Sequence, residues 1–308
     1  MNKGFTTNIK IGVLGGGQLG RMLQQKALCL GLDIAFIDPD ENAPCKEISA
    51  RFFKGDLKDF ETVYSFGKGK DVITIEIEHV NVQALEKLQQ EGVKVFPQPN
   101  IIKIIQDKGL QKIFYKENNI PTSDFFLINE KSEIPLFEEH FPLMQKMRKG
   151  GYDGQGVTPM RSKLDFEAGF DTPSILEKMV DFEKELSVIV ARNENGEIKS
   201  FPCVECEFNP EVNLVEFLFS PANISDEIEK KSQKIAKDVI EKLGMVGILA
   251  VELFLTKDGD ILVNEVAPRP HNSGHQTIEG NYESQYGQLL RCLLNSISIV
   301  YQTCSTVY

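Results

Sequence analysis

The first hundred residues alternate short apolar runs with segments of helical spacing. The apolar runs have the length of buried strands, and each helical segment can return the chain to the same edge of a sheet. This order predicts an open, mostly parallel sheet of about five strands. We expect strands at 9–14, 34–37, 51–54, 71–79 and 93–96, and helices at 21–30, 59–66 and 82–90. Ligands bind beyond the carboxyl ends of such strands.

The first strand ends in a glycine turn, Gly15-Gly16-Gly17-Gln18-Leu19-Gly20. The turn matches GxGxxG, and Asp38 ends the second strand, where a dinucleotide enzyme holds the ribose. Taken alone, the match is typical of an NAD site. Two alternatives stay open: the glycines only permit a tight turn and close helix packing, or the helix N-terminus binds another anion.

Two carboxylates, Glu76 and Glu78, lie at the end of the run at 71–79. Residues two apart share a face of a regular strand, so this pair requires a cationic or donor-rich partner. The alternative is a strand end in contact with solvent. In a parallel sheet these carboxylates gather at the same edge as the glycine turn.

A second glycine-rich loop follows the apolar run that starts at Met144. The run carries Lys146, Arg148 and Lys149 toward glycines at positions 150, 151, 154 and 156. Backbone N–H groups of glycine can close on an anion, and glycine keeps the loop mobile. We interpret this loop as a lid over nucleotide phosphates; the alternative is a long hairpin turn.

A carboxylate pair is predicted where Asp258-Gly259 separates the apolar runs 248–255 and 261–266. If these two residues form the hairpin loop, Glu252 lies directly opposite Glu265. Two opposed carboxylates repel each other unless a divalent cation lies between them, and hard oxygen ligands favour magnesium. The alternative is a longer turn with a shifted register, in which one glutamate faces water.

Arg269 and His271 follow directly after this hairpin, in a segment dense in polar groups. Arginine can hold an anion through two parallel hydrogen bonds, and histidine can donate a hydrogen bond or move a proton. The alternative is a structured loop that contains a buried Arg–Glu pair.

Three domains are expected from the position of prolines and from the order of the predicted helices and strands. Pro97 and Pro99 mark the first boundary, and we predict an α/β domain at 1–102 and two α+β parts, a small one with the lid at 103–182 and a larger one at 183–308.

The net charge of −11 argues against a general nucleic-acid binder but permits an anionic small substrate. Neither a signal peptide nor a membrane span is predicted. Cys203 and Cys206 form a lone CxxC, so reduced thiols in a cytoplasmic protein are expected rather than zinc.

Three motifs together resemble the ATP-grasp enzymes of purine synthesis, and among them the N5-carboxyaminoimidazole ribonucleotide synthases. The motifs are Gly16-Gly17-Gln18-Leu19-Gly20-Arg21-Met22, Gly150-Gly151-Tyr152-Asp153-Gly154-Gln155-Gly156, and the stretch from Asn264 to His275. The resemblance implies an ATP-grasp fold that follows a parallel-sheet pre-ATP-grasp domain. It also implies ATP- and Mg²⁺-dependent conversion of bicarbonate to carboxyphosphate, which carboxylates aminoimidazole ribonucleotide.

The resemblance also assigns residues to the nucleotide and the metal. The phosphate contacts would be Lys108, Lys146 and the lid residues Gly151, Tyr152, Asp153, Gly154, Gln155 and Gly156. The hinge that reads adenine, largely through its backbone, would be Glu177, Lys178, Met179 and Val180. Further nucleotide positions would be Glu185 at the ribose, Glu205, Asn264 and Glu265, with Glu252 and Glu265 as metal ligands.

On the side of the ribonucleotide and carboxyphosphate, the resemblance implies a second set of residues. This set is Gln18, Glu76, Tyr152, Asp153, Arg269 and His271, of which Asp153, Arg269 and His271 would be catalytic and Glu78 could replace Glu76. Family members usually continue into a small C-terminal domain that holds the substrate phosphate. This sequence stops at Tyr308, so that domain is expected to be absent. The family also implies a homodimer.

Overall fold

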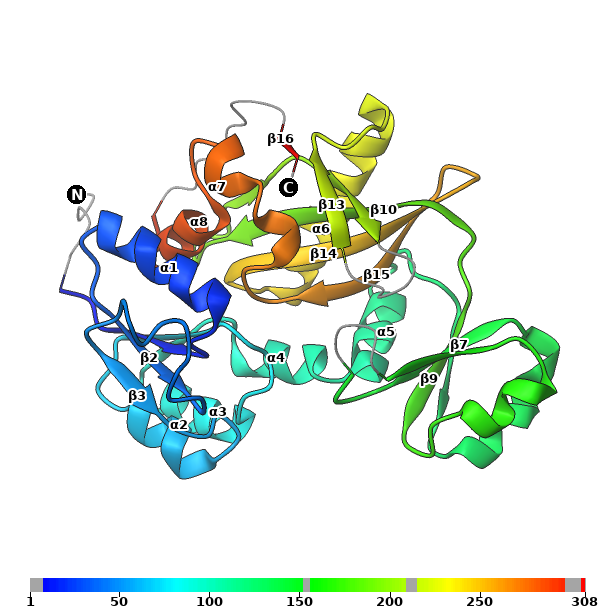
Figure 1. Cartoon of the computed structure of the whole chain (residues 1–308), viewed down its shortest axis with the longest axis horizontal. Helices are drawn as coiled ribbons and strands as arrows, with labels where there is room; N and C mark the ends of the chain where they lie inside the picture. The colour runs from blue at the N-terminus through cyan, green and yellow to red at the C-terminus, as the bar shows by residue number, and fades with distance from the viewer. Residues whose placement is uncertain (1–7, 152–155, 209–214, 297–305, 308) are drawn as a thin grey trace.

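Three β-sheets organise the chain in a computed structural model that describes residues 8–151, 156–208, 215–296 and 306–307 (Figure 1). The N-terminal sheet lies at the left of Figure 1, a small sheet lies at the right, and a large sheet lies above and between them. Helices α4 (Pro99–Ile105) and α5 (Lys108–Glu117) run between the N-terminal and small sheets. Within the described part of the chain, no helix combines the length and apolarity that a membrane span requires.

The N-terminal sheet has five parallel strands in the order β3-β2-β1-β4-β5, which confirms the predicted open parallel sheet. Its strands are β1 (Ile11–Leu14), β2 (Ile34–Asp38), β3 (Phe52–Lys54), β4 (Val72–Ile75) and β5 (Lys94–Val95). Its helices are α1 (Gln18–Cys29), α2 (Phe60–Gly67) and α3 (Val82–Gln90). Strand β4 is shorter than the run at 71–79, so Glu76 and Glu78 lie beyond it and the regular-strand prediction for them is wrong.

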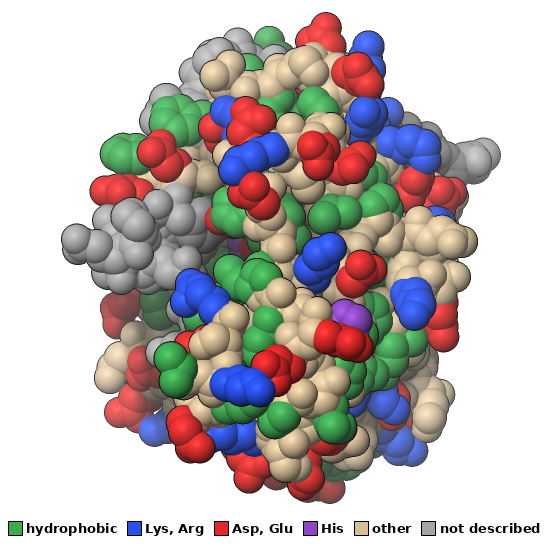
Figure 2. Space-filling model, turned by 90° about the vertical axis from the view of Figure 1, so that its right-hand side faces the viewer, with side chains coloured by type: hydrophobic (Ala, Val, Ile, Leu, Met, Phe, Trp, Pro, Cys, Tyr) green, Lys and Arg blue, Asp and Glu red, His purple; other side chains and the backbone are tan. Residues whose placement is uncertain are grey.

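The small sheet contains the strands on either side of the second glycine-rich loop. It is antiparallel in the order β6-β9-β7-β8. Its elements are β6 (Phe125–Ile128), η1 (Lys131–His140), β7 (Leu143–Met147), β8 (Val157–Met160), η2 (Lys163–Ala168) and β9 (Ser174–Lys178). Ile134 and Leu176 are among the buried residues of its own small core. On the face shown in Figure 2, acidic and basic side chains are interspersed.

The large sheet has the order β15-β14-β10-β12-β13-β16, and β11 pairs with β10. Its strands are β10 (Phe182–Arg192), β11 (Ile198–Ser200), β12 (Val204–Phe208), β13 (Val215–Ser220), β14 (Gly247–Thr256), β15 (Ile261–Ala267) and β16 (Thr306–Val307). Helix α6 (Asp226–Leu243) packs on it; Ser225 caps its first turn, and Gly244 ends it at φ 62°. The elements after β15 are η3 (Asn272–Gly274), α7 (Thr277–Gly280) and α8 (Gln285–Leu293).

One apolar core is shared by the N-terminal and large sheets. It contains Leu23 of α1, Phe36 of β2, Ile248 of β14 and Leu289 of α8. The N-terminal and large sheets therefore share a core to which α1 and α8 contribute, while the small sheet has its own core. The division at residues 102 and 182 stays a prediction.

A buried ion triad reinforces the contact between α1 and the segment that contains α8. The Glu283 carboxylate, 6% exposed, accepts from Lys26 Nζ at 2.6 Å and from Arg291 Nε at 2.7 Å. We expect Glu283→Gln to lower the free energy of unfolding by about 2 kcal/mol, because two cations lose their shared partner. Urea unfolding measures this loss. Asp238→Asn, which breaks an exposed pair with Lys234 on α6, should change stability by less than about 0.5 kcal/mol. Equal losses for the two variants would contradict the prediction.

Candidate active site

The β14–β15 hairpin places Glu252 and Glu265 side by side, but with a different register from the predicted one. Leu255 pairs with Ile261, so the loop is one residue longer than Asp258-Gly259, and the predicted two-residue turn is wrong. The register shifts between Val251 and Leu253, which restores the predicted pairing of Ala250 with Ala267. This irregularity places Asn264 and Glu265 together across from Glu252.

The two carboxylates differ in their partners and in their proton affinity. Glu265 forms an ion pair with Lys108 at the start of α5, and the Lys108 ammonium lowers the pKa of Glu265. Burial and then the neighbouring charge of Glu265 raise the pKa of Glu252. Two carboxylates that cannot both ionise without a counter-charge are the oxygen donors that Mg²⁺ prefers. The donor set therefore fits a hard divalent cation, which Glu252 and Glu265 would hold.

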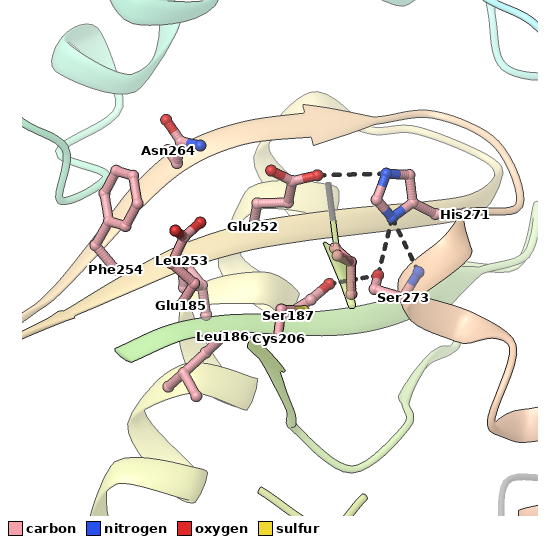
Figure 3. Close-up of a pocket in the computed structure, with 11 residues that line it drawn as sticks. Glu185, Leu186, Ser187, Cys206, Glu252, Leu253, Phe254, Asn264, His271 and Ser273 are labelled. Carbon is pink, nitrogen blue, oxygen red and sulfur yellow. Dashed lines mark hydrogen bonds and ion pairs between the residues drawn. The ribbon is translucent and has the colours of Figure 1, made fainter. Parts of the chain in front are cut away.

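His271 closes one side of this carboxylate pair. Its Nε2 lies 3.3 Å from Glu252 Oε1, and its Nδ1 lies 2.9 Å from Ser273 Oγ, which in turn contacts Ser187 Oγ at 2.7 Å (Figure 3). Burial and the nearby Arg269 charge lower the pKa of His271 to about 4. The ring is therefore neutral at pH 7, and its orientation is set by the two serines.

A second cluster gathers around the Glu177 carboxylate at the end of β9. Its Oε2 lies 2.8 Å from Lys146 Nζ, and its Oε1 lies 2.5 Å from Lys112 Nζ. Lys146 also donates to Asn264 Oδ1 at 3.1 Å, which ties this cluster to the carboxylate pair. The Glu177 side chain therefore joins two lysines, while the predicted role of its backbone in the adenine hinge stays a prediction.

Two small pockets meet at Asn264. One is lined by Lys108, Lys112, Lys146, Glu177 and Glu265, with Gln111 and Ile175. The other is the pocket of Figure 3, whose polar lining includes Glu185, Ser187, Glu252 and His271. Burial raises the pKa of Glu185 to about 7, so this carboxyl can hold a proton near neutral pH. A row of cations on one side and a more apolar pocket on the other would suit a nucleoside triphosphate.

Glu205 is not brought into this pocket. On β12 it pairs across the strand with Leu186, whereas its neighbour Cys206 pairs with Glu185 and lines the pocket. Opposed residues share a face, so Glu205 lies on the other side of the sheet, where it contacts Lys184 Nζ at 2.6 Å. We therefore withdraw Glu205 from the predicted nucleotide contacts.

The segment that leads into the second glycine-rich loop is anchored to α5. Asp107 caps the helix at Gly109 N and Leu110 N, and it accepts two 2.8 Å hydrogen bonds from the Arg148 guanidinium. Gly156 has φ 78° and lies against Gly151, where an added Cβ would come within 3.1 Å of the Gly151 Cα. The predicted site residues Tyr152, Asp153, Gly154 and Gln155 lie outside the described residues.

Two backbone amides of the predicted hinge at the end of β9 donate hydrogen bonds to carbonyl groups of the protein. Lys178 N donates to Asp124 O at 2.9 Å, and Met179 N donates to Pro142 O at 3.3 Å. The Lys178 side chain is exposed, whereas Met179 and Val180 are partly buried. These amides hold the hinge to the small sheet, so adenine recognition by the hinge stays a prediction.

The glycine turn after β1 is filled by protein groups. The Glu76 carboxylate lies in it and accepts from Gly20 N at 3.3 Å, while Asp38 accepts from Gly16 N at 2.7 Å. A Cβ on Gly15 or Gly17 would collide with Glu76 atoms at 2.5 and 2.8 Å. The NAD interpretation fails here, because Asp38 holds the turn and Glu76 occupies the place of a pyrophosphate. Gln18, the first residue of α1, is exposed beside the turn.

Arg269 joins the hairpin to the edge of the N-terminal sheet. Its Nε and Nη2 donate to the two oxygens of Glu78 at 2.6 and 3.3 Å. This is the Arg–Glu pair that the sequence left open as an alternative. Burial favours a neutral arginine, but the Glu78 carboxylate outweighs it and raises the pKa of Arg269. Glu76, Arg269 and His271 thus belong to one polar region above the parallel sheet.

Acid should weaken the fold through Glu177. Burial alone would raise its pKa, but Lys146 and Lys112 lower it from 4.5 to about 2. The carboxylate therefore stabilises the folded state above pH 4.5, and this contribution is lost as the pH falls toward 2. We expect a loss of about 3 kcal/mol over that interval, measured by urea unfolding at pH 5, 4, 3 and 2. Glu177→Gln should be less stable at pH 7 and show a flatter acid dependence; the same slope in both proteins would contradict this assignment.

Comparison with known proteins identifies relatives along nearly the whole chain. Residues 8–106 match the ribonucleotide synthetase preATP-grasp domain, and residues 113–286 match the ATP-grasp domain. Phosphoribosylaminoimidazole carboxylase, chloroplastic, of Vigna aconitifolia is 40% identical over 92% of this chain and 51% of its own length. N5-carboxyaminoimidazole ribonucleotide synthase of Bacillus subtilis is 34% identical over 92% of this chain and 75% of its own length.

A solved structure gives the same result. N5-carboxyaminoimidazole synthase of Aspergillus clavatus, in complex with ADP and 5-aminoimidazole ribonucleotide, is 36% identical with a TM-score of 0.89. The match covers 95% of this chain and 78% of that one. The chain spans about half the length of the first curated relatives that it matches.

Proposed function

Because the chain belongs to the N5-carboxyaminoimidazole ribonucleotide synthase family of ATP-grasp enzymes, we propose that it carboxylates 5-aminoimidazole ribonucleotide with ATP and bicarbonate. The observation that carries the proposal is the junction of two pockets at Asn264. Lysines line one pocket, and the carboxylate pair Glu252 and Glu265 lies where the two pockets meet. The resemblance assigns Lys108 and Lys146 to the nucleotide, and Glu252 and Glu265 to the metal.

In the nucleotide half, Lys108 and Lys146 hold the phosphates of ATP, and Gly151 to Gly156 close over them. The hinge from Glu177 to Val180, largely through its backbone, and Glu185 face the adenosine. Phosphoryl transfer requires positioning and charge neutralisation, which these cations supply. Mg²⁺ held by Glu252 and Glu265 would neutralise phosphate charge when it is bound.

In the other half, Gln18, Glu76, Arg269 and His271 hold the ribonucleotide and carboxyphosphate, together with Tyr152 and Asp153 of the lid. A bicarbonate oxygen attacks the γ-phosphorus, the bond to ADP breaks, and carboxyphosphate forms. The exocyclic amine then attacks the carboxyl carbon, or carbon dioxide released from carboxyphosphate, and phosphate leaves as the amine loses a proton. Lid closure excludes water, which would hydrolyse the intermediate.

The test is ADP release from the purified protein with ATP and Mg²⁺. We expect release only when bicarbonate and aminoimidazole ribonucleotide are both present. Release that depends on a different nucleotide or carboxylate would indicate another ATP-grasp ligase. ATP binding with background release under every condition would indicate a binding protein without turnover. We further propose that the protein is a cytoplasmic homodimer. Light scattering of the purified protein tests the oligomeric state.

A further inference from the structure

Lys112, on the second turn of α5, is the most deeply buried cation beside the candidate phosphate pocket. Its side chain is 3% exposed, whereas those of Lys108 and Lys146 are 22% and 17% exposed. Lys108 and Lys112 are four residues apart, so they lie on the same face of α5 and both line the pocket. The four-residue spacing of Lys108 and Lys112 is visible in the sequence.

All three N–H groups of the Lys112 ammonium are used by protein acceptors. They go to Glu177 Oε1 at 2.5 Å, Thr122 Oγ1 at 2.6 Å and Ser123 Oγ at 3.2 Å. An ammonium has three donors, so none is left for a phosphate oxygen. Lys112 can therefore influence a nucleotide only through the groups that it holds.

Glu177 is the group through which Lys112 reaches the pocket. One carboxylate oxygen faces Lys112 and also accepts from Ser123 Oγ, and the other faces Lys146. With Lys112 in place, the two lysines and Glu177 carry a net charge of about +1; without it, Glu177 would neutralise Lys146. Thr122 Oγ1 also donates to Val263 O at 2.7 Å, directly before Asn264 on β15.

We propose that Lys112 is a positioning residue for the nucleotide site: it balances the charge of Glu177 and fixes its carboxylate, so that Lys146 points into the pocket as an unneutralised cation. Lys112 itself touches no phosphate. The inference rests on the proposed nucleotide site at Lys108 and Lys146. It attributes part of the ATP affinity of that site to a third lysine, Lys112, which does not contact the nucleotide.

The test is a double-mutant cycle of Lys112 and Glu177 on the full chain, with the dissociation constant of ATP measured by calorimetry. Lys112→Met should weaken ATP binding about tenfold when Glu177 is present, because Lys146 is then neutralised. In a Glu177→Gln background the same substitution should change binding by no more than about twofold, because no carboxylate remains to balance. A purely structural lysine would not show this dependence. Lys116→Met, an exposed lysine one turn further along α5, is the matched control and should bind ATP like the wild type.

Equal losses in the two backgrounds, or unchanged binding by Lys112→Met, would overturn the proposal. If Lys112→Met fails to fold by circular dichroism, the double variant is compared with Glu177→Gln alone. Equal ATP affinity of these two supports the proposal, and a tenfold weaker double variant overturns it. Absence of ATP binding by the wild type would instead refute the proposed function, so the two failures are distinguishable.

Discussion

Glu265→Gln is expected to lower ADP release, as kcat/KM for ATP, by about a thousandfold, or on the order of 4 kcal/mol of transition-state stabilisation. Glu265 is one of two carboxylates across the β14–β15 hairpin, and it also holds Lys108. An amide of the same shape removes the charge that a divalent cation requires and releases the lysine from its partner. One substitution is therefore expected to disturb both the proposed metal site and the proposed phosphate contact of Lys108.

The measurement is ADP release as a function of Mg²⁺ concentration, together with calorimetry of ATP without metal. The variant should require far more Mg²⁺ for half-maximal rate, while metal-free ATP binding stays within about tenfold of the wild type. Glu241→Gln, an exposed glutamate on α6, is the matched control and should keep the wild-type rate. Full activity of Glu265→Gln at the usual Mg²⁺ concentration would contradict the metal assignment.

The proximity of Glu252 and Glu265 was predictable, because Asp258-Gly259 between two apolar runs fixes a hairpin to within one residue. The extra loop residue and the irregularity that offsets it were not. Each shifts the register by one, and their effects cancel between Val251 and Leu253. Sequence patterns report the alternation of faces, but a bulge leaves that alternation intact on either side. The predicted opposition of the two glutamates therefore held approximately, although the turn was wrong.

Contacts between side chains that are far apart in the sequence could not be predicted from the sequence. The glycine turn matched a dinucleotide motif, yet its occupant is Glu76, which lies 56 residues from Gly20. Likewise, nothing near Glu205 or Glu177 in the chain shows that Lys184 or Lys112 is the partner. Local patterns predicted the strands that carry these side chains. The packing of separate elements decides which neighbour each face of a strand meets. Glu205 is an example, because it lies on the face of β12 opposite to that of Cys206.

The second large effect is expected at Arg269, where lysine should not replace arginine. The guanidinium holds both oxygens of Glu78 at the edge of the N-terminal sheet, which an ammonium cannot do with the same planar geometry. Lysine would leave Glu78 partly unpaired beside Glu76, in the region proposed for the ribonucleotide. We expect Arg269→Lys to lower ribonucleotide-dependent ADP release about a hundredfold, and Arg269→Met to lower it at least as much.

ATP affinity separates this effect from a general loss of structure. Arg269 lies above the parallel sheet, and it is absent from the residues that line either pocket beside Asn264. The dissociation constant of ATP for Arg269→Lys should therefore stay within about threefold of the wild type, while Lys146→Met should weaken ATP binding by roughly a hundredfold. The two substitutions divide the site into a nucleotide half and a ribonucleotide half. If Arg269→Lys and Lys146→Met weakened ATP binding alike, Arg269 would belong to the nucleotide half, and the assignment of Arg269 and its neighbour Glu76 to the second substrate would be lost.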